Sequence, residues 1–518
     1  MRRIDIFEKQ CFRSLRGALD PWQSQCLHSV RDCFALLAMT KRIFFKVFRI
    51  HFLITLIFFI LFASWAYAAE PSPLINPDDI KCQPLTFAPP KAERIKLKNG
   101  IVLYILEDHE LSLINISAVV RTGSIYNPEG KEGLAEITGT VMRTGGTKKR
   151  TGDEIDEALE CFAGTIDVSI GMESGSVALS VFKKDLDEGL DIFSDIIMNP
   201  VFDDNKLKTA KNLKIEALRR ILDEPQKVAF REFRRLIYTG DPRGRLPSIE
   251  SVENILKDDL LIFHKSFFYP ENIMVAVTGD ITRDEAVSKI NRYFRGWDRK
   301  GKNAKISCPR VKKRRTINYI YKDIPQSTII IGYLTPGKKN HDFYPFTVLD
   351  FILGSGGFRS RIIHEVRNNL GLAYSTGSFY KGKSKYGIFG AYAITKSSST
   401  AKVLSLIMSI IDDVRSKKIT EGELSWAKKS INNRFIFSFD STDQIAIQQM
   451  MIEYNKLPGD FLTTYRNKIE KVDKEYLKKV AKEYLSFNEA TILVVGNEKA
   501  FDKPLSTFGK VTMVEGKF

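Results

Sequence analysis

Arg367 and Tyr374, an arginine and a tyrosine seven positions apart, are residue types that can polarise a carbonyl group. They follow the glycine-rich segment 353–357, which lacks the Gly-Lys-Ser/Thr ending of a phosphate-binding loop. The guanidinium of arginine offers a rigid fork of donors to carbonyl oxygens, and a tyrosine hydroxyl can donate to a developing oxyanion. The structural alternative is a buried arginine paired with a carboxylate, beside a tyrosine ring packed in the core.

In a second segment, 133–142, one helical turn separates Glu136 from Thr140, and Gly139 lies between them without a side chain. A carboxylate and a hydroxyl are hard oxygen ligands, which hold zinc poorly against water and competing metals. Gly139 cannot act as a general base, a role that typically contributes ~10²–10⁴-fold to a rate. A further carboxylate, Glu216, lies on the predicted helix 211–225, where its structural interpretation is a solvated helix residue.

The frame around 133–142 resembles the active-site segment of the insulinase/pitrilysin family of zinc peptidases. Active members read roughly G-x-A-H-x-x-E-H-M, in which two histidines bind zinc and the glutamate activates a water molecule. On this frame Glu136 stands at the first histidine, Gly139 at the glutamate and Thr140 at the second histidine. The resemblance therefore implies the scaffold of a zinc peptidase without its zinc ligands, and we expect no metal cofactor in this chain.

The same resemblance implies roles for a further zinc-ligand position and for the Arg367/Tyr374 pair. The family's third zinc ligand is a glutamate on a later helix, and its position falls on Glu216 or Ala217. The pair Arg367 and Tyr374 matches the family's C-terminal hallmark, in which both side chains reach toward the scissile peptide.

Histidine and cysteine supply no replacement site. Outside the first 68 residues no histidine has a second histidine or a cysteine at ligand spacing, and the adjacent His364 and Glu365 should diverge on a helix. The histidines concerned are His109, His264, His341 and His364. After residue 68 three cysteines remain, Cys82, Cys161 and Cys308. This odd number favours free thiols, although one disulfide is possible.

Alternating and apolar runs predict the elements that position these residues. Strands are expected at 94–97, 101–106, 113–120, 165–170 and 175–182, and helices at 133–143, 152–162, 186–198, 204–222 and 226–237. The turn Lys98-Asn-Gly100 predicts a hairpin between the first two strands.

The chain also repeats itself at long range. Residues 252–279 and 476–496 share a helix, a turn and a buried strand that ends in glycine, a spacing typical of duplicated domains. We predict an α+β fold of two homologous halves, 86–298 and 316–515, joined by a basic linker, 299–315. The resemblance implies that each half packs an antiparallel sheet against helices, and that together they form a clamshell chamber.

Charge and the N-terminus bear on partners and compartment. Residues 1–68 carry ten Lys or Arg and four Asp or Glu, so +11 of the formal +17 belongs to the rest, where acids are interspersed. That pattern does not favour nucleic acid. Residues 39–68 have a basic start, the apolar run 52–62 and an Ala-x-Ala end, which predicts a secretory signal cleaved after Ala68. Residues 1–38 do not fit in front of a signal peptide, so we interpret them as a spurious upstream extension.

The sequence thus predicts an exported, periplasmic or extracellular protein; the alternative is an uncleaved membrane anchor. Because some family members divide zinc and the Arg/Tyr pair between two subunits, the main hypothesis is a non-catalytic subunit that binds unstructured peptides. Its partner would be a homologous zinc-bearing subunit. The alternatives are a binding or structural protein without a peptidase role, and an autonomous metallopeptidase that uses Glu136 and Glu216.

Overall fold

The computed structural model describes residues 89–301, 307–309, 315–416 and 419–515. The predicted extension 1–38, the signal peptide 39–68 and Cys82 lie outside these residues, and the linker 299–315 is described only in part. The predicted domain boundaries stay predictions.

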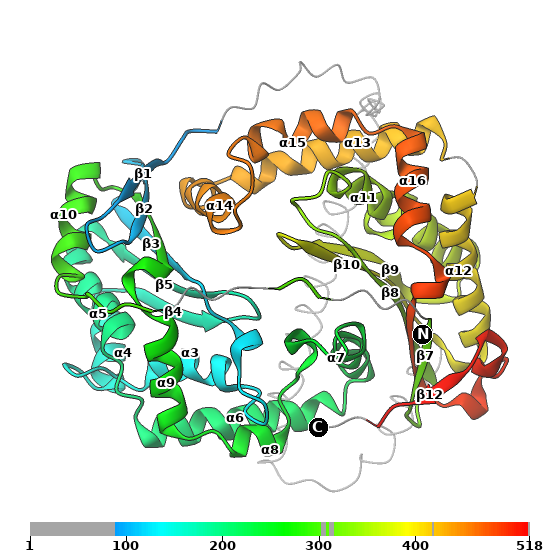
Figure 1. The fold of residues 1–518 in the computed structure, drawn as a ribbon, viewed down its shortest axis with the longest axis horizontal. Helices are drawn as coiled ribbons and strands as arrows, with labels where there is room; N and C mark the ends of the chain where they lie inside the picture. The colour runs from blue at the N-terminus through cyan, green and yellow to red at the C-terminus, as the bar shows by residue number, and fades with distance from the viewer. Residues whose placement is uncertain (1–88, 302–306, 310–314, 417–418, 516–518) are drawn as a thin grey trace, which may run out of the picture. The chain divides into compact units, whose positions relative to one another are not determined.

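Two six-stranded sheets form the framework (Figure 1). The first has the order β1-β2-β6-β3-β5-β4 and comprises β1 (Glu93–Lys96), β2 (Val102–Glu107), β3 (Leu113–Val120), β4 (Thr165–Ile170), β5 (Gly175–Phe182) and β6 (Ile273–Gly279). The second has the order β12-β7-β11-β8-β10-β9 and comprises β7 (Thr316–Tyr321), β8 (Gln326–Pro336), β9 (Ala373–Gly382), β10 (Tyr386–Lys396), β11 (Thr491–Gly496) and β12 (Val511–Met513).

The two sheets share one topology over five strands. In each, the strand after the long helical segment (β6 or β11) lies between a parallel neighbour (β2 or β7) and an antiparallel one (β3 or β8). The other pairs are antiparallel: β3 with β5 and β5 with β4 in the first sheet, and β8 with β10 and β10 with β9 in the second. At the edge of the second sheet, β12 pairs with β7 in parallel. The predicted duplication and the α+β class are therefore confirmed, with the difference that each sheet contains parallel pairs. The predicted chamber stays a prediction.

Helices cover the sheets in both halves. The first half contains α3 (Leu134–Thr144), α4 (Gly152–Cys161), α5 (Leu186–Met198), α6 (Asp204–Ile221), α7 (Pro225–Ile237), α8 (Ile249–Glu253), α9 (Lys257–Phe267) and α10 (Arg283–Tyr293). The second contains α11 (Phe343–Asp350), α12 (Thr400–Ser416), α13 (Glu421–Ile436), α14 (Thr442–Tyr454), α15 (Phe461–Glu470) and α16 (Lys474–Tyr484). Every strand and helix predicted from 94 to 237 is present.

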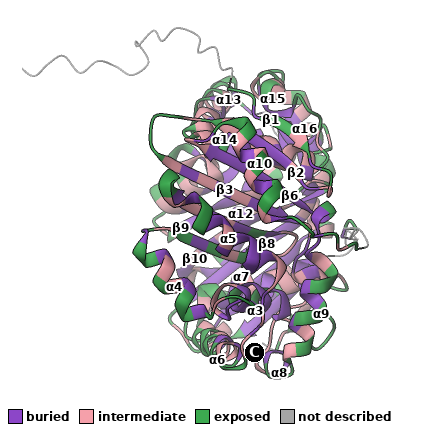
Figure 2. Ribbon diagram, turned by 90° about the vertical axis from the view of Figure 1, so that its left-hand side faces the viewer, coloured by how far each residue is buried: buried purple, intermediate pink, exposed green. Residues whose placement is uncertain are grey.

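Each half has its own apolar core, and burial follows the expected alternation. In β3 the residues Ile114, Ile116 and Ala118 are buried, as the period of a half-buried strand requires. Figure 2 shows buried strands within each sheet and exposed positions on the outer helices. At the predicted hairpin, Gly100 has φ +101°, which a side chain would strain, so the glycine is required there.

One helix of each half packs on the sheet of the other half (Figure 1). From the first half, α7 lies on β8 and β11, and Phe233 fills the space that a side chain at Gly332 would need. From the second half, α14 lies on β2 and β6, where Met450 is fully buried. This exchange fixes the two halves against each other and so fixes the groups that each half presents.

Candidate functional site

Helix α3 carries the three positions that the resemblance aligns with the family's zinc motif. It begins where the Asn127 side chain accepts a hydrogen bond from Ala135 N (3.0 Å), which satisfies a backbone donor of the first turn. Glu136 and Thr140 are exposed on one face, whereas Gly139 is buried. The helix therefore presents a carboxylate and a hydroxyl at the two positions that the resemblance aligns with zinc-binding histidines.

Glu136 is bonded to a cation from a second helix. Lys214 Nζ, on α6, lies 2.5 Å from Glu136 Oε2, and the lysine side chain is only 19% exposed. Burial lowers the pKa of Arg234, on α7, and the charge of Glu136 is among those that oppose this shift. Glu136 is thus paired with a cation, which is the reverse of what a carboxylate ligand of a positive metal ion requires.

The other two motif positions offer no ligand either. The Thr140 hydroxyl donates to the carbonyl oxygen of Glu136 in its own helix (3.1 Å). A Cβ atom at Gly139 would lie 3.1 Å from Ile170 Cγ1 and 3.3 Å from Ile170 N in β4. A side chain at this position would therefore need Ile170 to shift by a few tenths of an ångström.

The third-ligand position also departs from a metal site. Glu216 Oε1 lies 3.2 Å from Arg220 Nε on the same helix, and Arg219 is 4.0 Å from Glu216 Oε2. Lys214 is the residue of α6 that faces α3, and Ala217 follows it by three positions, on the same face. The structure therefore does not bring Glu216 together with Glu136, and the face directed at α3 carries an ammonium group.

These donors do not fit a zinc ion. Structural and catalytic zinc sites use three or four thiolate, imidazole or carboxylate ligands. Within the described ranges, no three or more His, Cys, Asp or Glu residues cluster so as to hold a metal ion. The carboxylate that is present, Glu136, is held by an ammonium group.

The histidines outside the leader have local roles. His264 is buried, its Nε2–H donates to Ile197 O at 2.8 Å, and burial lowers its pKa to about 4. His109, which is exposed, lies 2.7 Å from Asp280, and that carboxylate raises the pKa of His109. The expectation that His364 and Glu365 diverge is wrong. Their side chains approach to 3.4 Å because both are partly exposed and Asn369 bridges them.

Arg367 and Tyr374 come together on the second half. Arg367 lies in a π-helix, Ile363–Asn369, and Tyr374 lies at the start of the edge strand β9. The Arg367 Cζ atom is 4.6 Å from the centroid of the Tyr374 ring. Tyr374 is 83% exposed, so the structural alternative of a tyrosine packed in the core is wrong. Single-turn π-helices occur frequently at functional sites.

Sequence reasoning missed a third member of this group. Phe358 is 61% exposed, and its ring centroid lies 4.9 Å from Arg367 Cζ. The signal that could have identified it is a large aromatic residue directly after the glycine-rich turn, where a solvated loop would carry polar residues. Glu136 contacts Lys214 of the first half, and Arg367 contacts the two aromatic rings of the second half.

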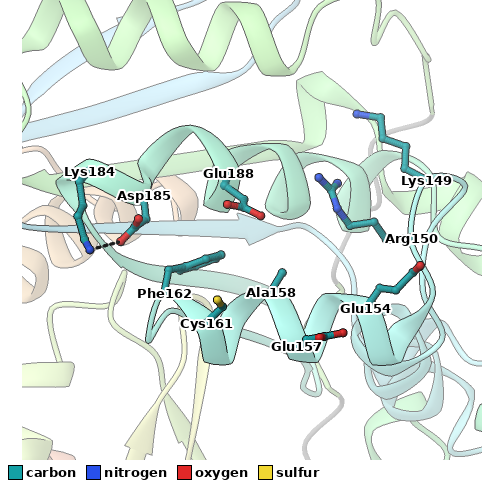
Figure 3. Close-up of a pocket in the computed structure, with 10 residues that line it drawn as sticks. All are labelled: Lys149, Arg150, Glu154, Glu157, Ala158, Cys161, Phe162, Lys184, Asp185 and Glu188. Atoms are coloured by element: carbon teal, nitrogen blue, oxygen red, sulfur yellow. Dashed lines mark ion pairs between the residues drawn. The ribbon is translucent and has the colours of Figure 1, made fainter.

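A hollow of about 560 Å³ between α4 and α5 lies apart from both groups (Figure 3). Cys161, a free thiol, comes from α4, and the ion-paired Lys184 and Asp185 precede α5. Two cations of its rim, Lys149 and Arg150, bind Asp191. The cations that line the hollow therefore already have carboxylate partners, as on a solvated surface. Cys308 is also a free thiol.

Among the helices of the described ranges, none combines the length and the hydropathy that a membrane span requires. The apolar run 52–62, the candidate for an anchor, lies outside those ranges.

Known proteins resemble this chain over most of the described residues. Residues 104–246 match the family described as insulinase (peptidase family M16), and residues 254–431 match the one described as peptidase M16 inactive domain. An uncharacterized zinc protease of Rickettsia felis is 25% identical over 346 residues, which cover 66% of this chain and 82% of that protein. The non-peptidase homolog YmxG of Helicobacter pylori is 25% identical over 401 residues, which cover 76% of this chain and 91% of that protein.

The fold agrees with a solved structure as well. The peptidase M16 inactive domain from Pseudomonas fluorescens matches with a TM-score of 0.72 and 20% identity, over 78% of this chain and 98% of that one. At this identity the likeness shows the fold alone.

Proposed function

Because this chain belongs to the insulinase family, peptidase family M16, yet lacks its zinc ligands, we propose that it is a non-catalytic, peptide-binding subunit of a zinc peptidase. Its partner is a homologous subunit that holds the zinc. The observation that carries this proposal is the contrast between two groups. The Arg367/Tyr374 pair is exposed, whereas the motif position Glu136 is bonded to Lys214.

Arg367 is available for a ligand. Within the part of the chain that the structure describes, no carboxylate lies within 4 Å of its guanidinium nitrogens, so its donors can bind peptide carbonyl oxygens. The Tyr374 hydroxyl, on the same surface, can donate to an oxygen on which negative charge develops. The partner's zinc supplies the activated water. This chain binds the peptide and stabilises charge.

Extended, unstructured peptides suit this site. Tyr374 begins an edge strand, β9, and an extended peptide can add to a sheet edge through its backbone. The net charge of +11 on residues 69–518 favours peptides that are neutral or acidic. Nucleic acid is not part of this proposal.

We further propose export of the chain, with cleavage after Ala68. The mature N-terminus, determined by mass spectrometry of the secreted protein, tests this step. A chain that retains residues 39–68 in the membrane fraction would instead support an anchor.

The decisive experiment combines this chain with a homologue from the same genome that has an intact H-x-x-E-H motif. Peptide hydrolysis should appear only in the mixture. Tyr374→Phe should lower kcat by ~10²-fold, as loss of an oxyanion donor does, and Arg367→Ala should raise KM about tenfold. Tyr321→Phe, at an exposed tyrosine on β7, is the matched control and should behave as wild type.

Two results would overturn the proposal. Hydrolysis by this chain alone would favour an autonomous peptidase. A partner complex whose activity is unchanged by both Arg367→Ala and Tyr374→Phe would favour a binding or structural protein without a peptidase role.

A further inference from the structure

The Arg367 guanidinium lies against two exposed aromatic rings. Its Cζ atom is 4.9 Å from the ring centroid of Phe358 and 4.6 Å from that of Tyr374. Both distances are within the range of cation–π attraction, about 6 Å. Tyr374 already has a role in the proposed function, whereas Phe358 has none.

Phe358 is in an unusual place for a phenylalanine. It is 61% exposed, so the hydrophobic effect gives little reason for an aromatic side chain there. Its contact with the cation of Arg367 does give one. An arginine side chain without a carboxylate partner loses rotamer freedom when it binds a ligand. A ring that restricts the guanidinium beforehand reduces that loss.

The backbone holds Phe358 in position. Gly357, just before it, has φ +78°, and Ser360 donates through its backbone nitrogen (2.9 Å) and hydroxyl (2.6 Å) to Gly357 O. Asn368 Nδ2, next to Arg367, donates to Phe358 O at 3.3 Å. The glycine-rich turn and the π-helix are therefore joined at Phe358 and at the residue next to Arg367.

We propose that Phe358 is a positioning residue, which holds the Arg367 guanidinium by a cation–π contact so that its donors face an incoming peptide. The inference rests on the proposed function, since it assumes that Arg367 binds peptide. It assigns Phe358 no direct part in the chemistry.

The proposed role depends on the aromatic ring. The substitutions are therefore chosen to distinguish the effect of the ring from that of an apolar side chain of similar size. Phe358→Leu keeps an apolar side chain and removes the ring quadrupole. It should weaken peptide binding about two- to fivefold, the size expected of an exposed cation–π contact. Phe358→Tyr and Phe358→Trp keep the ring and should restore wild-type binding. With the zinc-bearing partner, Phe358→Leu should raise KM and leave kcat unchanged.

The measurement is fluorescence anisotropy of fluorescein-labelled β-casein, an unstructured polypeptide, titrated with the whole chain produced with its own leader. Phe437→Leu is the matched control, because Phe437 is a 75% exposed phenylalanine elsewhere in the second half. Arg359→Ala is the charge control, because Arg359 is in the same turn and contacts the Trp426 ring instead. Both controls should bind casein as wild type does.

A double-mutant cycle decides the inference. If Phe358 acts through Arg367, Phe358→Leu has no further effect in the Arg367→Ala background. An equal loss in both backgrounds overturns it, since Phe358 would then contact the peptide by itself. If Arg367→Ala weakens binding but Phe358→Leu does not, the positioning role is wrong and the proposed function stands. If Arg367→Ala has no effect on binding or hydrolysis, the proposed function itself fails.

Discussion

Lys214 and Glu136 connect the same two helices, α3 and α6, that a family zinc ion would connect through its ligands. The difference from a zinc site is thus more than the absence of histidines. A cation from one helix meets an anion from the other, and Gly139 brings α3 close to Ile170. A bound ion is not required to hold these helices together.

This predicts that the melting temperature is independent of zinc. A metal that binds only the folded chain raises stability by RT ln(1 + [L]/Kd), so a real site shows as a concentration-dependent shift. Differential scanning calorimetry with excess zinc and with excess EDTA should give the same Tm. A zinc-dependent rise that Glu136→Gln removes would contradict the prediction and restore the autonomous metallopeptidase as a candidate.

At the scale of elements, a buried carboxylate anchors the segment that carries the Arg367 group. Asp350 ends α11 and precedes the π-helix Phe351–Ser355. Its Oδ1 accepts from Ser378 Oγ of β9 at 2.6 Å, and Ser355 and the backbone of Tyr380 also donate to it. Burial raises its pKa to about 6 despite these hydrogen bonds.

The stability of the chain should therefore respond to the titration of Asp350. Its folded pKa lies above the ordinary value of 3.8, so the folded chain binds the proton more tightly than the unfolded chain. Stability from this group is thus highest below pH 4, falls as pH rises through 6, and stays low above it. Asp350→Asn removes this dependence. The free energy of unfolding, measured with urea, should therefore change in favour of the variant. Between pH 4 and pH 8 the value for Asp350→Asn should rise relative to that of the wild type by roughly 2–3 kcal/mol. A pH-independent difference would contradict this.

Some of these elements and contacts can be predicted from the sequence, and others cannot. Strands and helices from 94 to 237 follow from apolar periodicity, and the resemblance located Arg367 and Tyr374. The bond between Lys214 and Glu136 joins residues 78 positions apart and depends on how α6 crosses α3. The π-helix and the contact of Phe358 with Arg367 depend on local hydrogen bonding that has no distinct sequence period. Parallel pairing of β2 with β6 depends on the course of the whole first half.

At the scale of the whole described chain, the two halves share buried contacts. Arg243 is 2% exposed and binds Glu173 at 2.7 Å, Asp241 at 2.8 Å and, from the second half, the Tyr386 hydroxyl at 2.9 Å. Tyr386 also donates to Glu173 at 2.7 Å. Together with the exchanged helices α7 and α14, this network predicts that the halves unfold as one cooperative unit.

Tryptophan fluorescence can test that cooperativity, because in the chain from Ala69 each half has one tryptophan, Trp297 or Trp426. In the Trp426→Phe variant the remaining tryptophan, Trp297, reports on urea unfolding of the first half. In the Trp297→Phe variant, Trp426 reports on the second half. The two midpoints should coincide once corrected for the effect of each substitution on stability. Arg243→Met leaves carboxylates without their buried partner. It should lower both midpoints together, in proportion to a loss of about 3 kcal/mol in the free energy of unfolding. Arg94→Met breaks an exposed pair with Glu453 and should cost less than about 1 kcal/mol. Separate midpoints in the two single-tryptophan chains would mean that the halves unfold independently, and would contradict this prediction.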